Sequence, residues 1–167
     1  SSSDLAKEAK MLEEAGLDEI TIMDSAGTML PEEAEEYSRS LCGTVKIPVA
    51  FHCHNNLGLS VANALAAEKG GATVFDCGLM GMARSAGNCA TELAAAVFQR
   101  YGAMEYVDLY TLLDFIDKEL APAMKGVYQA PVKPQDLVYG LAGCHSNFAK
   151  LFEAVAEEKG VHLYKLI

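Results

Sequence analysis

The sequence predicts an α/β fold with a parallel sheet, followed by a helical region, and three observations support this. Strand-like and helix-like patterns alternate through the first two-thirds of the 167-residue chain. The expected strands begin near residues 19, 45 and 73, about 27 residues apart, a spacing typical of βαβ units. After the last of these units, only helical patterns follow with a clear signal. We therefore expect two domains, residues 1–107 and 108–167.

The first expected elements are a helix, a strand and a second helix. Residues 4–15 place apolar side chains at helical spacing, and Gly16 is a suitable helix end. Residues 19–23 are β-branched and apolar, which predicts a strand. Pro31 begins the second helix, whose N-terminus is rich in acidic side chains that the helix dipole favours, and Gly43 ends it.

Two further strand–helix pairs and a weaker fourth strand follow. The second strand carries Pro48 near its beginning, and a glycine-rich loop joins the third strand to its helix. These elements are expected at residues 45–51 (strand), 57–69 (helix), 73–77 (strand), 89–101 (helix) and 104–107 (weak strand). The helical region then comprises residues 108–120, 135–141 and 146–159.

Composition excludes several classes of function. The formal net charge of −10, with only 13 Lys and Arg, argues against binding nucleic acid, which requires a basic surface. No apolar run approaches the roughly 20 residues of a membrane-spanning helix. The five cysteines are odd in number and form no C-x-x-C pair. We therefore expect reduced thiols in a cytoplasmic protein.

The most informative motif is His52-Cys-His54, at the end of the second expected strand. Side chains alternate along a strand, so the two imidazoles point the same way. Ligands of parallel α/β folds collect at the C-terminal ends of the strands, where two such imidazoles can chelate a divalent metal. The alternative is a hydrogen-bonded histidine pair that serves only packing.

Carboxylates end the two neighbouring strands. Asp24 and Asp76 are expected at the same end of the sheet as the histidines. Each has four possible roles: a metal ligand, a partner that orients a histidine, a base, or a cap of the following loop.

The glycine-rich loop that follows the third strand carries two further candidates. Arg84 is suited to holding a carboxylate, but it equally fits a solvated loop charge. Asn88 is either the N-cap of the next helix or an oxygen ligand to a hard metal. The loop matches neither a P-loop nor the G-x-G-x-x-G pattern.

Read together, these segments resemble the carboxyl-terminal half of the DRE-TIM metallolyase superfamily, which includes hydroxymethylglutaryl-CoA (HMG-CoA) lyases. The likeness is closest to the 4-hydroxy-2-oxovalerate aldolases. Four stretches carry it: Met23–Pro31, Phe51–Asn63, Asp76–Asn88 with Glu92, and Gly140–Phe148. The resemblance implies a partial TIM (β/α) barrel, equivalent to strands five to eight, followed by a helical C-terminal region. The family's amino-terminal half, with a metal-ligating Asp and a catalytic Arg, has no counterpart here.

The resemblance also implies roles for individual residues. His52 and His54 match the family's two metal ligands, and Asn88 matches an asparagine ligand of the related lyases. His145 stands where the aldolases have a tyrosine that assists proton transfer, so we expect it to be catalytic. With the loop motifs, Asp24, Ser25 and Arg84 become the expected substrate-binding residues.

The implied activity is reversible cleavage of a 4-hydroxy-2-oxoacid to pyruvate and an aldehyde, with Mn²⁺ or Mg²⁺ as cofactor. The family also implies an acylating aldehyde dehydrogenase as partner, and the open half-barrel suggests a homo-oligomer. Two alternatives stay open. One is an acyl-CoA-dependent Claisen synthase of the isopropylmalate or homocitrate type. The other is a non-catalytic half-barrel that serves binding or assembly.

Overall fold

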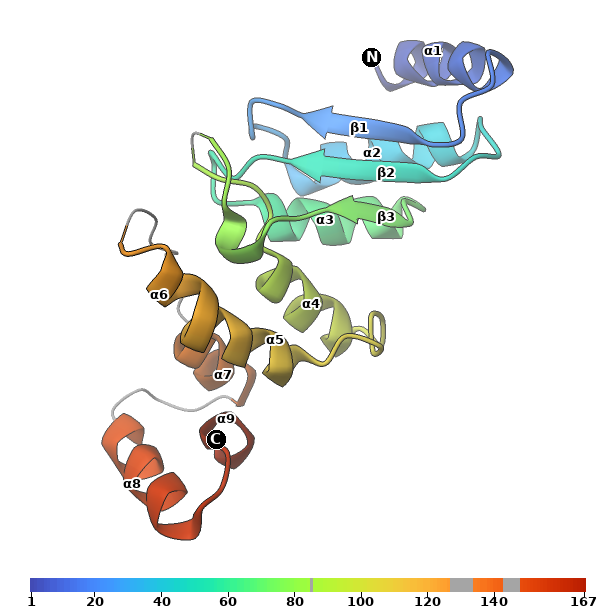
Figure 1. Ribbon diagram of the computed structural model, residues 1–167. Coiled ribbons are helices and arrows are strands. Elements are labelled where there is room, and N and C mark those ends of the chain that lie inside the picture. Colours follow the sequence, from blue (N-terminus) through green and yellow to red (C-terminus); the bar gives the residue numbers. More distant parts are fainter. Residues whose placement is uncertain (85, 127–133, 143–147) are drawn as a thin grey trace. The chain divides into compact units, whose positions relative to one another are not determined.

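A computed structural model describes residues 1–84, 86–126, 134–142 and 148–167 of the chain (Figure 1). The chain divides into two compact units, Ser1–Tyr101 and Gly102–Ile167. The boundary expected after residue 107 falls within the second unit, shortly before its first helix.

The first unit contains a three-stranded parallel sheet in the order β1-β2-β3 (Figure 1). The strands are β1 (Ile20–Asp24), β2 (Val49–Cys53) and β3 (Val74–Asp76). In register, β1 residue Met23 pairs with His52, and His52 pairs with Asp76 of β3. The parallel α/β arrangement predicted from the spacing of the patterns is therefore confirmed.

Four helices accompany this sheet: α1 (Ser2–Glu14), α2 (Pro31–Cys42), α3 (Ser60–Lys69) and α4 (Thr91–Arg100). Helices α2 and α3 lie against one face of the sheet (Figure 1). Pro31 occupies the first turn of α2, and the Glu33 side chain accepts a hydrogen bond from the Leu30 N–H at 2.8 Å. Helix α3 begins where the Asn55 side chain accepts the N–H of Ser60.

Two predicted elements begin later than expected and one predicted strand is a turn, in each case for a local reason. Strand β2 begins at Val49 rather than residue 45, because Pro48 has no N–H to donate to a neighbouring strand. Helix α3 starts three residues after Leu57, since Gly58 closes a turn onto Asn55. The weak strand at 104–107 is wrong: these residues form a turn in which Val107 N–H donates to the Met104 carbonyl.

Large apolar side chains and alanines fill the interior of the first unit. Phe51, Phe98 and Leu41 are at most 2% exposed. Small side chains on α3 and α4, such as Ala67 and Ala95, are fully buried. Small alanine side chains let these helices approach their neighbours closely. The sheet end that carries the histidines is therefore supported by densely packed helices.

Within its described residues, the second unit is helical. It contains α5 (Leu109–Phe115), a π-helical turn η2 (Ile116–Leu120), α6 (Ala121–Ala123), α7 (Pro134–Ala142), α8 (Ala149–Lys159) and α9 (Leu163–Leu166). The helical pattern predicted for this region is thus present, and Leu113 and Ile116 are its most buried large side chains.

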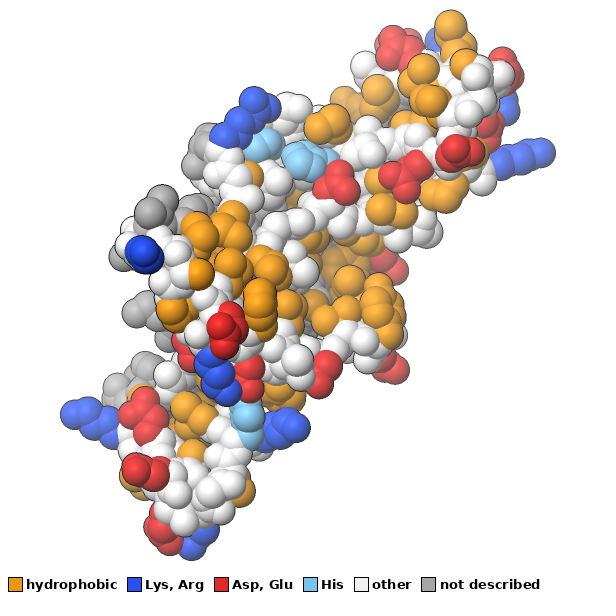
Figure 2. All heavy atoms as spheres, viewed as in Figure 1, with side chains coloured by type: hydrophobic (Ala, Val, Ile, Leu, Met, Phe, Trp, Pro, Cys, Tyr) orange, Lys and Arg blue, Asp and Glu red, His pale blue; other side chains and the backbone are white. Residues whose placement is uncertain are grey.

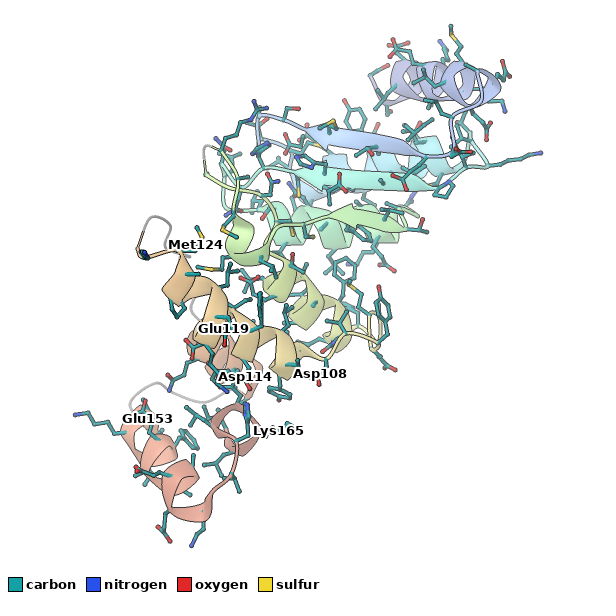
Figure 3. All side chains as sticks on the ribbon, viewed as in Figure 1. Asp108, Asp114, Glu119, Met124, Glu153 and Lys165 are labelled. Carbon is teal, nitrogen blue, oxygen red and sulfur yellow. The ribbon has the colours of Figure 1, made fainter. Side chains whose placement is uncertain are left out.

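Side chains on α5 and η2 hold the C-terminal segment of this unit. Oδ2 of Asp114, a residue labelled in Figure 3, lies 2.6 Å from Nε2 of His162. The hydroxyl of Tyr164 donates to Asp117 at 3.2 Å. These two contacts fix the short α9 against the α5–η2 helix. Across the described parts of both units, no helix is long and apolar enough to cross a membrane.

Candidate functional site

The two histidines of the H-x-H motif lie side by side at the C-terminal end of β2. Their ring centroids are 5.4 Å apart, with an interplanar angle of 70°. They lie on the sheet face opposite the helices, because Phe51 and Cys53 alternate with them and Cys53 donates to the Ser60 carbonyl of α3. Figure 2 shows two neighbouring histidine side chains on the surface of this unit. The same-face prediction is therefore confirmed.

Asp76 is the partner of His52. The register places both side chains on one face, and Oδ2 of Asp76 lies 3.4 Å from Nδ1 of His52. A carboxylate at this position favours the tautomer with the proton on Nδ1, which leaves Nε2 available as a ligand atom. Of the roles open to Asp76, the structure supports that of a residue that orients a histidine.

His54 and Asn88 face each other across an isolated antiparallel bridge. Nδ1 of His54 and Oδ1 of Asn88 are both buried and have no hydrogen-bond partner among the described residues. The N-cap interpretation of Asn88 is wrong, because α4 begins only at Thr91 and its N-cap is Ala90. Each unpartnered buried atom carries a desolvation cost, which a bound cation would offset.

Backbone hydrogen bonds fasten the glycine-rich loop to the end of β2. The Asn55 N–H donates to the Gly87 carbonyl at 2.8 Å, and the Cys89 N–H donates to the Cys53 carbonyl at 3.2 Å. At the other end of the loop, the Gly78 N–H donates to the Cys89 carbonyl. The position of Asn88 beside the histidines therefore follows from main-chain contacts on both sides of it.

Asp24 ends its strand at the expected end of the sheet but lies on the opposite face from His52. It pairs in register with Cys53, which points toward the helices. Its buried carboxylate accepts the N–H groups of Thr28 and Met29, both at 3.0 Å. Asp24 thus caps the loop after β1, which corresponds to the capping role weighed above, and the neighbouring Ser25 is exposed.

The loop that Asp24 caps packs closely on the histidine segment. Gly27 has φ +64°, and a Cβ atom on it would lie 2.8 Å from the His54 carbonyl oxygen and 2.7 Å from the Asn56 nitrogen. The Gly27 carbonyl also accepts the N–H of Leu57. Only glycine fits this position without displacing the backbone of the candidate site.

Arg84 is the remaining expected site residue that the structure describes. Arg84 is exposed, and no ion pair found within the described ranges includes it. His145 lies outside the described residues.

Two thiols near the site, Cys77 and Cys89, hydrogen-bond to each other, and Cys89 also hydrogen-bonds to Cys53. Hydrogen bonding with Cys53 raises the pKa of Cys89 to about 12. Hydrogen bonding with Cys89, followed by burial, raises the pKa of Cys77 far above its usual range. Both shifts favour the protonated thiols of Cys77 and Cys89, whereas metal binding requires thiolate. Cys42 and Cys53 also form no disulfide within the described part of the chain.

The candidate ligand set is therefore two imidazoles and one amide oxygen. Within the ranges that the structure describes, no three His, Cys, Asp or Glu side chains converge on one point. The unpartnered atoms on His54 and Asn88 nevertheless fit a divalent cation that accepts nitrogen and oxygen ligands.

Two acidic residues matter more than their sequence context indicated. Asp76 was one of several strand-end carboxylates, and only the register of β2 with β3 identifies it as the partner of His52. Glu92 accompanies the Asp76–Asn88 stretch of the sequence, which gave it no role. Its side chain is buried and accepts the N–H of Met80 at 3.0 Å. Burial raises the pKa of Glu92.

The first unit is thus a parallel α/β unit with a histidine pair at the C-terminal end of β2, an arrangement compatible with part of a (β/α) barrel. Comparison with known families is specific: residues 1–118 match the HMGL-like family. The chain belongs to the HMGL-like family.

Curated relatives agree with this assignment. The chain is 42% identical over 145 residues to a 4-hydroxy-2-oxovalerate aldolase of Chloroflexus aurantiacus, covering 87% of this chain and 42% of that protein. It is 41% identical over 157 residues to 4-hydroxy-2-oxovalerate aldolase 2 of Rhodococcus jostii, covering 94% of this chain and 45% of that protein. The chain thus spans less than half the length of these relatives.

Solved structures support the fold. An HMG-CoA lyase from Acinetobacter baumannii superposes with a TM-score of 0.69 at 24% identity, covering 87% of this chain and 48% of that one. This likeness concerns the fold alone. Because about half of such a lyase matches, the first unit is part of a TIM-type (β/α) barrel, as the resemblance predicted.

Proposed function

We propose that this chain is part of a divalent-metal-dependent aldolase that cleaves 4-hydroxy-2-oxoacids to pyruvate and an aldehyde. The observation that carries the proposal is the pair of unpartnered buried atoms on His54 and Asn88, beside His52. The aldolase names of the relatives supply the reaction class.

In this proposal His52, His54 and Asn88 hold Mn²⁺ or Mg²⁺. A metal held there would supply Lewis-acid polarisation of a bound 2-oxoacid. Asp76 favours the proton on Nδ1 of His52, which leaves Nε2 available to bind the metal. Asp24 fixes the loop that supports His54, rather than contacting substrate through its capped oxygens.

Further proposals concern substrate binding, proton transfer, partners and location. Ser25 and Arg84 are exposed, and we propose that they bind the substrate carboxylate. His145 is proposed to carry a proton between substrate and solvent. An acylating aldehyde dehydrogenase partner, a homo-oligomer and a cytoplasmic location follow from the resemblance and from the reduced thiols.

The proposal is tested by product analysis of the complete enzyme of which this chain is proposed to be part, with Mn²⁺ and 4-hydroxy-2-oxopentanoate. Pyruvate release, measured with lactate dehydrogenase and NADH, is the expected result, and the His52→Ala variant should release none. Thiol release from acetyl-CoA, with a 2-oxoacid as acceptor, would instead identify a Claisen synthase. A complete protein that binds Mn²⁺ but converts neither substrate would contradict the proposed catalysis and favour the assembly role.

A further inference from the structure

Glu92 is a buried carboxylate that is not among the proposed metal ligands. It lies in the first turn of α4 and is 4% exposed. Burying a carboxylate is costly unless the group is well satisfied. The α4 N-terminus offsets part of this cost through its dipole, and the Met80 N–H supplies a hydrogen bond to Oε2. The burial of the Glu92 carboxylate therefore suggests that it has a structural role.

The residue that Glu92 binds has an unusual backbone. Met80 lies in the short 3₁₀ turn η1 (Leu79–Gly81) and has φ 57° and ψ 13°, the left-handed region that non-glycine residues rarely adopt. Such a conformation persists only where surrounding contacts enforce it. The Glu92 carboxylate is such a contact, because it accepts the N–H of this same residue.

The η1 turn in turn sets the backbone of Asn88. The carbonyl of Gly81, the residue after Met80, accepts the Asn88 N–H at 3.0 Å. On the other side of the turn, Gly78 accepts the N–H of Thr91 and donates to the Cys89 carbonyl. A chain of contacts therefore runs from Glu92 through Met80 and Gly81 to Asn88.

We propose that Glu92 is a positioning residue: its buried carboxylate holds the η1 turn, and the turn places the Asn88 amide oxygen beside His54. The Mn²⁺ consequence of this inference rests on the proposed metal site, whereas the ordering of Asn88 does not. The Glu92 side chain touches neither His54 nor Asn88 in any described hydrogen bond, so its effect is transmitted through the backbone.

The test measures amide hydrogen exchange in the metal-free chain by NMR, and then Mn²⁺ affinity by electron paramagnetic resonance. Glu92→Leu removes the acceptor. Glu92→Asp keeps the charge but is one methylene shorter, and Glu92→Gln keeps an acceptor of the same length. Phe98→Leu is the control, because it loosens the packing of the same helix on Phe75 of β3 and leaves the Glu92 carboxylate in place.

We expect Glu92→Leu and Glu92→Asp to lower the protection of the Met80 and Asn88 amides roughly tenfold, the equivalent of one lost hydrogen bond. Glu92→Gln should retain the protection, and the Phe51 amide in β2 should be unaffected. If Glu92→Leu does not fold, the Asp and Gln variants decide the question. Unchanged protection at Asn88 in the Asp variant, or an equal loss in Phe98→Leu, would overturn the inference.

Mn²⁺ affinity separates this inference from the proposed function. If the wild-type chain binds Mn²⁺, we expect weaker binding in the Leu and Asp variants and restored binding in Glu92→Gln. Unchanged Mn²⁺ affinity in the Asp variant would overturn the positioning role. If the wild-type chain binds no Mn²⁺, the proposed function fails, while the exchange rates alone still confirm or overturn the link from Glu92 to Asn88.

Discussion

His54 and Asn88 are joined by a backbone bridge, and their Nδ1 and Oδ1 atoms are buried with no hydrogen-bond partner among the residues that the structure describes. Each such atom costs about 1–3 kcal/mol of desolvation in a protein interior. A bound divalent cation would supply the interaction that both atoms lack. This relationship links the packing of the glycine-rich loop to the proposed chemistry.

The first prediction concerns Asn88→Ala. The substitution removes an acceptor that makes no bond in the metal-free chain, so the free energy of unfolding should change by less than about 1 kcal/mol. Mn²⁺ affinity should fall at least about tenfold, because one oxygen ligand is lost. Urea denaturation and Mn²⁺ titration of the same samples check both parts. Marked destabilisation with unchanged Mn²⁺ affinity would show that Asn88 serves packing.

The second prediction concerns Asp76→Asn. An amide in place of the carboxylate weakens the control of the His52 tautomer, so Mn²⁺ affinity should fall by about 10–100-fold. Competition with a calibrated chelator measures this change. Asp18→Asn, another exposed carboxylate of the first unit, is the matched control and should bind Mn²⁺ like the wild type. Equal affinities for all three proteins would exclude a role for Asp76.

The third prediction compares two glycines with similar backbone angles. Gly27 has φ +64° and no room for a Cβ atom, whereas Gly58 has φ +73° and nothing within 4 Å. Gly58→Ala should cost about 1 kcal/mol from backbone strain alone. Gly27→Ala should cost more and weaken Mn²⁺ binding, because it displaces the His54 backbone. Equal melting temperatures for the two variants would contradict the close approach.

The fourth prediction is a pH dependence. Burial raises the pKa of Glu92 above its usual value, so the folded state holds this proton more tightly than the unfolded state. Stability from this group is therefore greatest at low pH and is lost as pH rises through the folded-state pKa. Glu92→Gln does not titrate, so its stability relative to the wild type should increase from pH 4 to pH 7. A difference that is constant across this range, measured by urea denaturation, would exclude a raised pKa for Glu92.

Much of the fold could be predicted from the sequence because its signals are local. The strands expected near residues 19, 45 and 73 begin at Ile20, Val49 and Val74, and they and the helices between them follow from side-chain patterns and turn residues. His52 and His54 were predictable for the same reason, since alternation along one strand needs no knowledge of neighbouring strands.

The other site assignments depend on long-range contacts that no local pattern encodes. Alternation along β1 places Asp24 with Ile20 and Ile22, but whether this face is the one that carries the histidines is set by its register with β2. The partner of His52 depends likewise on the register with β3. A glutamate in the first turn of a helix is normally a solvated charge, and the burial of Glu92 follows from how η1 packs over α4.

The central claim is that His52 and His54 bind a divalent metal. The most direct test is a titration of the purified chain with Mn²⁺, read by electron paramagnetic resonance, alongside His52→Ala, His54→Ala and the control His162→Ala, a half-buried histidine of the second unit. The account predicts one Mn²⁺ per wild-type chain and His162→Ala chain, and at least about tenfold weaker binding in each of the other two variants. Equal binding by all four proteins, or no binding by the wild type, would contradict it.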